Sequence, residues 1–92
     1  MTELDQILGQ MIRDYRIKGN FTQADLAKKL GYGSTQFVSL FERGLSKIPL
    51  NVLGQLIILL NIPEKRVVKM LLDRYKKEVR NLIEAGKTRA RK

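Results

Sequence analysis

Two short helical segments joined by a glycine-containing turn constrain the fold of this chain more than any other sequence feature. Thr22 is a favourable helix N-cap, and Asp25 stands three residues later, where a capping-box acid belongs. Gly31 ends the segment because glycine readily adopts the left-handed backbone of a helix C-terminus. A second segment follows at once. The pattern predicts helices over about 22–30 and 35–43 with a tight turn between them.

The rest of the chain also has helical periodicity. Apolar residues spaced three and four apart predict helices over 2–18, 50–60 and 63–85. No segment alternates with the period of a strand, and no internal repeat is present. The sequence therefore predicts an all-α chain of five helices. We expect a compact domain over 1–62, a long C-terminal helix over 63–85 and a basic tail over 86–92.

Length and composition narrow the function. Ninety-two residues can bury one small core, and the chain contains no cysteine and no histidine. Disulfides, Cys/His zinc sites, cysteine nucleophiles and histidine acid–base catalysis are thereby excluded. We expect no enzyme, no metal site and no cofactor. The chain begins with acids at Glu3 and Asp5, and its apolar stretches are short, so we expect neither export nor a membrane span but a cytoplasmic (nucleoid) protein.

Positive charge is concentrated at the C-terminal end. The chain has 18 basic and 9 acidic side chains, a net charge of +9. Residues 1–62 carry seven basic and five acidic side chains, whereas residues 63–92 carry eleven and four. Such an excess favours a polyanionic partner, either nucleic acid or an anionic membrane surface. The acids Asp73, Glu78 and Glu84 on the last predicted helix argue against the membrane. The basic residues of the tail are either simply solvated or in contact with phosphates.

The two short helices have the sequence outline of a helix-turn-helix. In that motif the second helix lies in the DNA major groove, so it needs an apolar inner face and a polar outer face. Val38 and Phe41 are three residues apart and face inward together. Thr35, Gln36 and Ser39 form the polar outer set. Glutamine pairs with adenine through two hydrogen bonds, and serine or threonine can meet a donor or an acceptor.

At these residues the chain resembles the lambda-repressor-like, or Xre/Cro-type, helix-turn-helix proteins of bacteria and phages. The resemblance covers about residues 4–63, and the whole series at these spacings is far more specific than any single piece. The resemblance implies a DNA-binding transcriptional regulator. The matching residues are Leu8–Arg13, Arg16, Phe21–Ala27, Leu30, Gly31, Phe41–Gly44, Pro49, Leu53, Leu56, Ile57, Leu60 and Ile62.

The resemblance also implies roles for particular residues. Positions that contact DNA bases in the family match Thr35, Gln36, Ser39 and Leu40. Positions that contact the phosphate backbone match Gln23, Ser34, Arg43 and Lys47. Gln23 is the first residue of its helix, so both its backbone amide and its side chain would contact a phosphate, because helix N-termini bind anions. For Arg43 an alternative is an ion pair with Glu42 or with an acid of the first helix.

Two features depart from the family pattern, and the place of a third residue is open. The turn 32–34 is one residue longer than in many members. Leu40 stands where a polar base-contacting residue is common, so it contacts a thymine methyl group or no base at all. Phe37 is expected to wedge under the longer turn as part of the core, and the alternative is contact with DNA.

The long C-terminal helix carries a stripe that suits a coiled-coil seam. Its members follow spacings of four and three, and they are Val68, Leu72, Tyr75, Val79 and Leu82. An uncovered apolar stripe is a liability on a monomer, so we expect it to pair with a second copy of the chain. The alternatives are that it folds back onto the first helix or that it binds another protein.

Two functions follow from these expectations. The first is a repressor that binds an inverted-repeat operator in double-stranded DNA as a homodimer, because two half-sites compensate for the weak binding of one module. The second is an antitoxin or another interaction protein, in which the C-terminal helix binds a partner such as a toxin or a regulator. The two are compatible with one another.

Overall fold

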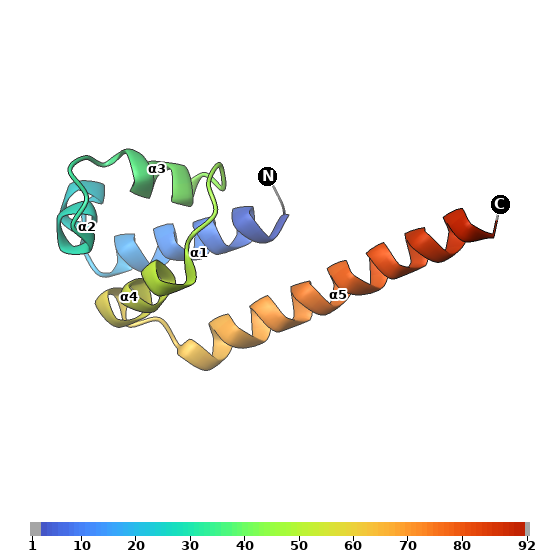
Figure 1. Cartoon of the computed structure of the whole chain (residues 1–92). Coiled ribbons are helices and arrows are strands. Elements are labelled where there is room, and N and C mark those ends of the chain that lie inside the picture. The colour runs from blue at the N-terminus through green and yellow to red at the C-terminus, as the bar shows by residue number, and fades with distance from the viewer. Residues whose placement is uncertain (1–2, 92) are drawn as a thin grey trace. The chain divides into compact units, whose positions relative to one another are not determined.

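The computed structural model describes residues 3–91, which form five helices and no strand (Figure 1). The predicted all-α fold is confirmed. The chain divides between Ile62 and Pro63 into two compact units, one containing α1–α4 and the other α5. The helices are α1 (Glu3–Lys18), α2 (Gln23–Leu30), α3 (Gln36–Glu42), α4 (Leu50–Leu60) and α5 (Glu64–Ala90).

Local signals in the sequence determine most helix ends. Asn20, Gly31 and Asn61 follow α1, α2 and α4 with left-handed backbones, at φ angles of 61°, 82° and 54°. The start of α3 differs by one residue from the prediction. Thr35 occupies the N-cap position without a side-chain hydrogen bond, and the helix begins at Gln36. Ser34 lies in the turn just before it, and its Oγ accepts from the amide of Gln36 at 3.4 Å.

The core of the first unit is apolar and draws on all four of its helices. The helix α3 packs mainly against α1, and α4 covers α1 as well (Figure 1). Burial of these side chains supplies most of the stabilisation of a domain this small. Ile57 of α4 is only half-buried. The buried apolar side chains of the unit are Leu8, Ile12, Leu26, Ala27, Val38, Phe41, Val52, Leu53, Leu56, Leu60 and Ile62.

The helix α5 is longer than the sequence suggested. The expected helix ended at Ala85, before a basic tail, but the observed helix continues to Ala90. No proline interrupts this segment, and the basic side chains of Lys87 and Arg89 interact favourably with the negative end of the helix dipole. The predicted helix end at Ala85 is therefore too early, and Lys92 lies outside the described residues. Within residues 3–91, no helix has the length and apolar character needed to cross a bilayer.

Candidate nucleic-acid interface

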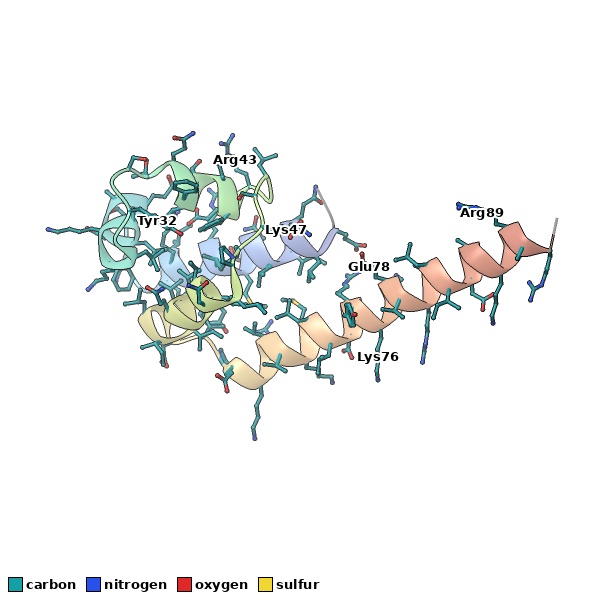
Figure 2. All side chains as sticks on the ribbon, in the orientation of Figure 1. Tyr32, Arg43, Lys47, Lys76, Glu78 and Arg89 are labelled. Atoms are coloured by element: carbon teal, nitrogen blue, oxygen red, sulfur yellow. The ribbon has the colours of Figure 1, made fainter. Side chains whose placement is uncertain are left out.

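The helix α3 has one buried face and one exposed face. Val38, Phe41 and Glu42 are buried against the rest of the unit. Gln36 and Arg43 are exposed, and their positions seven residues apart place them on the same outward side, two turns from one another. Figure 2 shows Arg43 pointing away from the first unit's core. An exposed polar face on a short helix that follows a tight turn is the geometry expected of a groove-binding helix.

The four residues expected to contact bases are not equally accessible. Thr35 and Gln36 are exposed at the start of α3, whereas Ser39 and Leu40 are half-buried one turn later. All four lie on or beside the outward face, so the structure brings them together on one surface. Their exposure decreases along the helix, and Gln36 has the longest side chain of the four.

Phe37 lies at the surface rather than in the core. The residue was expected in the core, yet 49% of it is exposed. Its ring stacks on Tyr32 of the turn, with 5.0 Å between ring centroids. Tyr32 in turn packs edge-on against the buried Phe41 at 6.4 Å (Figure 2 labels Tyr32). The Phe37 ring also lies 6.5 Å from that of Phe41, so the three rings form one aromatic cluster. The exposed half of Phe37 forms an apolar surface beside Gln36.

A polar cluster holds the C-terminal end of α3 in place. Arg16 of α1 donates from Nε to Glu42 Oε2 at 2.5 Å and from Nη2 to Oε1 at 3.0 Å. Its Nη1 donates to the carbonyl of Phe21 at 2.9 Å. Gln23 at the start of α2 donates from Nε2 to Glu42 Oε1 at 3.1 Å. One carboxylate therefore connects α1, α2 and α3, and such paired, bidentate bonds fix orientation as well as distance.

Sequence analysis missed this cluster, although one signal for it existed. Glu42 lies four residues after Val38, so both belong to the inward face of α3. A carboxylate on a buried face needs a cationic or hydrogen-bonding partner, since an isolated buried charge is very costly. The inward position of Glu42 thus predicts a basic partner elsewhere in the domain, and Arg16 is that residue.

Two glycines allow α1 to approach α3 closely. A Cβ atom on Gly9 would lie 2.1 Å from the carbonyl oxygen of Phe41, a distance no side chain can occupy. After α3, Gly44 has a φ of 70°, and a Cβ there would lie 2.8 Å from Cα of Gln6. The backbones of α1 and of the end of α3 are therefore in direct contact, which places the outward face of α3 with little freedom.

The residues expected to contact phosphates are also placed by the structure. Arg43 and Lys47 are exposed, at the end of α3 and in the loop before α4 (Figure 2). Arg43 Nε donates to the carbonyl of Ser39 at 3.4 Å. The alternative ion pair between Arg43 and Glu42 is not formed, because both oxygens of Glu42 accept from Arg16 and Gln23. Ser34 is exposed in the turn.

The start of α2 has the predicted capping box. The Thr22 amide donates to Asp25 Oδ2 at 2.9 Å, and the Asp25 amide donates to Thr22 Oγ1 at 3.0 Å. The hydrogen bond from the Thr22 backbone, followed by that from its side chain, lowers the pKa of Asp25 below its ordinary value. The side chain of Gln23 is partly engaged with Glu42, but its amide belongs to the first turn of α2, where helix amides have no intrahelical partner.

The five residues of the expected dimer seam lie along one side of α5. Tyr75 is 64% exposed and Leu82 66%, while Val79 is half-buried. Val68 and Leu72 are also exposed, and they line a shallow depression along α5 together with Tyr75. An uncovered apolar stripe of this length is available to a partner.

The sequence and the fold both resemble those of known helix-turn-helix proteins. A family model described as helix-turn-helix matches residues 12–67, more than half of the chain. No protein of curated function matches the sequence. The clp gene regulator ClgR from Corynebacterium glutamicum is 22% identical, with a TM-score of 0.66 over 90% of this chain and 93% of that chain. A chain of the SinR protein/SinI protein complex is 24% identical, with a TM-score of 0.53 over 92% and 99%. At these identities the likeness is one of fold.

Proposed function

Since the chain belongs to the helix-turn-helix family of DNA-binding proteins, we propose that it is a transcriptional repressor that occupies an inverted-repeat operator as a homodimer. It would act in the cytoplasm, on the nucleoid. The observation that carries the proposal is the outward face of α3. Gln36 and Arg43 are exposed there, while Glu42 on the opposite face is fixed by Arg16. A polar face held rigidly on a folded scaffold suits recognition of a groove.

Base contacts would come from the start of α3. Gln36 can form two hydrogen bonds with adenine, and the hydroxyls of Thr35 and Ser39 can meet either a donor or an acceptor. Leu40, half-buried on the same face, would contact the methyl group of a thymine. Each bidentate pair distinguishes the right base from the wrong one by about 1–3 kcal/mol.

Phosphate contacts would flank these bases. The amide of Gln23 and the hydroxyl of Ser34 would bind the backbone on one side, and Arg43 and Lys47 on the other. Lysine and arginine contacts release counterions, so binding would weaken steeply as salt rises. These contacts position α3 in the groove and carry no sequence information of their own.

Dimerisation would proceed through the seam on α5, formed by Val68, Leu72, Tyr75, Val79 and Leu82. Burying these exposed side chains removes apolar surface from water. A two-fold dimer would present two α3 helices to half-sites about 34–36 Å apart on one side of the duplex.

A selection experiment tests the proposed base contacts. Purified protein is used to enrich binding sites from random DNA, and an inverted repeat is expected. The Gln36→Ala, Ser39→Ala double variant should lose preference at defined positions of that repeat. Gln55→Ala, which removes an exposed amide on α4, is the matched control and should keep the wild-type preference. Unchanged preference in the double variant would show that these residues do not contact bases.

A second candidate function is that of an interaction protein such as an antitoxin, in which α5 binds a toxin or a regulator. The exposed stripe on α5 supports it equally well, and one structure of similar fold is of a protein–protein complex. Sedimentation of the purified chain separates the two. A stable homodimer favours the repressor, and a monomer that binds a co-purifying chain favours the interaction protein.

A further inference from the structure

Opposite charges lie on the two sides of the apolar stripe of α5. In heptad terms Val68, Tyr75 and Leu82 occupy one core position, with Leu72 and Val79 in the other. Lys69 and Lys76 each directly follow a core residue and form one flank. Glu64 and Glu78 form the other flank. Glu78 directly precedes the core residue Val79, and Glu64 lies two heptads before Glu78, in the same heptad position. All four charged side chains are exposed.

These flanks distinguish the two ways in which two copies of α5 can pair. In a parallel pair each flank faces the opposite flank of the partner, so the glutamate side meets the lysine side. In an antiparallel pair each flank faces its own equivalent, so lysines oppose lysines and glutamates oppose glutamates. Unlike charges across a seam attract, and like charges disfavour the pairing.

We propose that α5 pairs in parallel with α5 of a second copy, with Glu64 facing Lys69 of the partner subunit. This inference rests on the homodimer of the proposed function and adds its geometry. Glu64 and Lys69 flank the start of the apolar stripe, one on each side. Both also line the depression on α5, together with Val68, Leu72 and Tyr75. By two-fold symmetry the pair occurs twice.

Parallel pairing has a consequence for DNA. Each α5 directly follows its own first unit in the sequence, so parallel helices begin at the same end of the seam, next to both DNA-binding units. An antiparallel pair would place those units at opposite ends of helices about 40 Å long. The parallel dimer therefore fits two half-sites that are one helical turn apart.

Cysteine cross-linking tests the orientation, and the chain offers a clean background because it has no cysteine. Lys65 and Gly86 continue the line of core positions before Val68 and after Leu82. In the parallel pair, Lys65→Cys and Gly86→Cys should each oxidise to a disulfide-linked homodimer. Lys77→Cys, on the opposite side of α5, is the control and should remain uncross-linked. A dimer in which neither variant forms a disulfide would overturn the proposal, because an antiparallel pair places each of these two residues far from its own copy.

Charge reversal provides an independent test with opposite signs for the two orientations. Lys69→Glu should weaken dimerisation about tenfold at low salt if the pair is parallel, because two attractions become repulsions. Adding Glu64→Lys to that variant should restore it. In an antiparallel pair, Lys69→Glu would relieve repulsion between lysines and strengthen dimerisation, which overturns the proposal. Lys77→Glu makes the same change of charge away from the stripe and should have little effect.

The outcomes separate this inference from the proposed function. A monomeric wild-type chain in sedimentation would overturn both the homodimer and the parallel pairing. A dimer in which neither the Lys65→Cys nor the Gly86→Cys variant cross-links would overturn the orientation alone. Binding of the wild-type protein to a selected operator, measured separately, shows whether DNA recognition stands in either case.

Discussion

The guanidinium of Arg16 and the carboxylate of Glu42, 26 residues apart in the sequence, form a two-point ion pair that fixes the end of α3 on α1. The side chain of Glu42 is 2% exposed and that of Arg16 12%. A buried carboxylate is tolerated only where its charge is paired and its oxygens are hydrogen-bonded. The position of α3 therefore depends on a residue that lies on a different helix.

Removing Arg16 should strongly destabilise the first unit. In Arg16→Ala the buried carboxylate of Glu42 loses its cation, so we expect the free energy of unfolding to fall by about 3–5 kcal/mol. Urea denaturation followed by circular dichroism measures this change. Arg13→Ala removes an exposed arginine from the same helix and should change stability by less than about 0.5 kcal/mol. Equal stabilities of the two variants would show that the ion pair does not hold the fold.

Alanine substitutions at two glycines should have opposite effects on stability. Gly9→Ala forces a methyl group against the carbonyl oxygen of Phe41, and we expect a loss of about 1–3 kcal/mol or more. Gly54 lies inside α4 with nothing within 4 Å of a Cβ atom. Gly54→Ala should therefore stabilise the protein by about 0.5–1 kcal/mol through helix propensity. Thermal unfolding measures the change in stability of both variants. A Gly9→Ala variant as stable as the wild type would contradict the close contact between α1 and the end of α3.

The capping box should make stability depend on pH through Asp25. Its pKa is lowered in the folded chain, chiefly by the hydrogen bond from the Thr22 amide. The ionised carboxylate therefore adds stability that is present above the unfolded-state pKa of about 3.9 and is lost as the pH falls through the lower folded-state value. We expect Asp25→Asn to be less stable than wild type at pH 7, and the difference to vanish in acid. A difference that grows on acidification would reject this origin.

Salt dependence should separate phosphate contacts from base contacts. Lys47→Ala should weaken binding to all DNA sequences alike and reduce the slope of log K against log salt by about one. Gln36→Ala should leave that slope nearly unchanged and cost about 1–3 kcal/mol on the operator alone. Fluorescence anisotropy titrations at several salt concentrations test both. If Gln36→Ala weakened operator and random DNA equally, its assignment to a base would be wrong.

Features that depend on neighbouring residues were predictable from the sequence. The capping box of Thr22 and Asp25 and the left-handed Gly31 act within a single helical turn, so local spacing is sufficient to locate α2. The bounds of α4 likewise follow from its apolar period and from Asn61. The resemblance to helix-turn-helix proteins, carried by such local motifs, agrees with the family match.

Features that depend on contacts between distant residues could not be predicted from the sequence. The partner of Glu42 lies on α1, and no local spacing identifies it. Phe37 was misplaced because its environment depends on where the longer turn puts the ring of Tyr32. The predicted end of α5 at Ala85 is too early, because the helix continues through Gly86 and the basic residues after it to Ala90, although glycine weakens a helix. The base and phosphate contacts stay predictions, since they depend on DNA.

The helix α3 contains only seven residues. Isolated helices shorter than about 12–15 residues are marginal in water, so α3 has little stability of its own. Its helical conformation therefore depends on packing against α1 and α2. A peptide covering 35–43 would be largely unstructured and a poor substitute for the domain. The outward face of α3 is thus a cooperative property of the folded unit, present or lost as a whole.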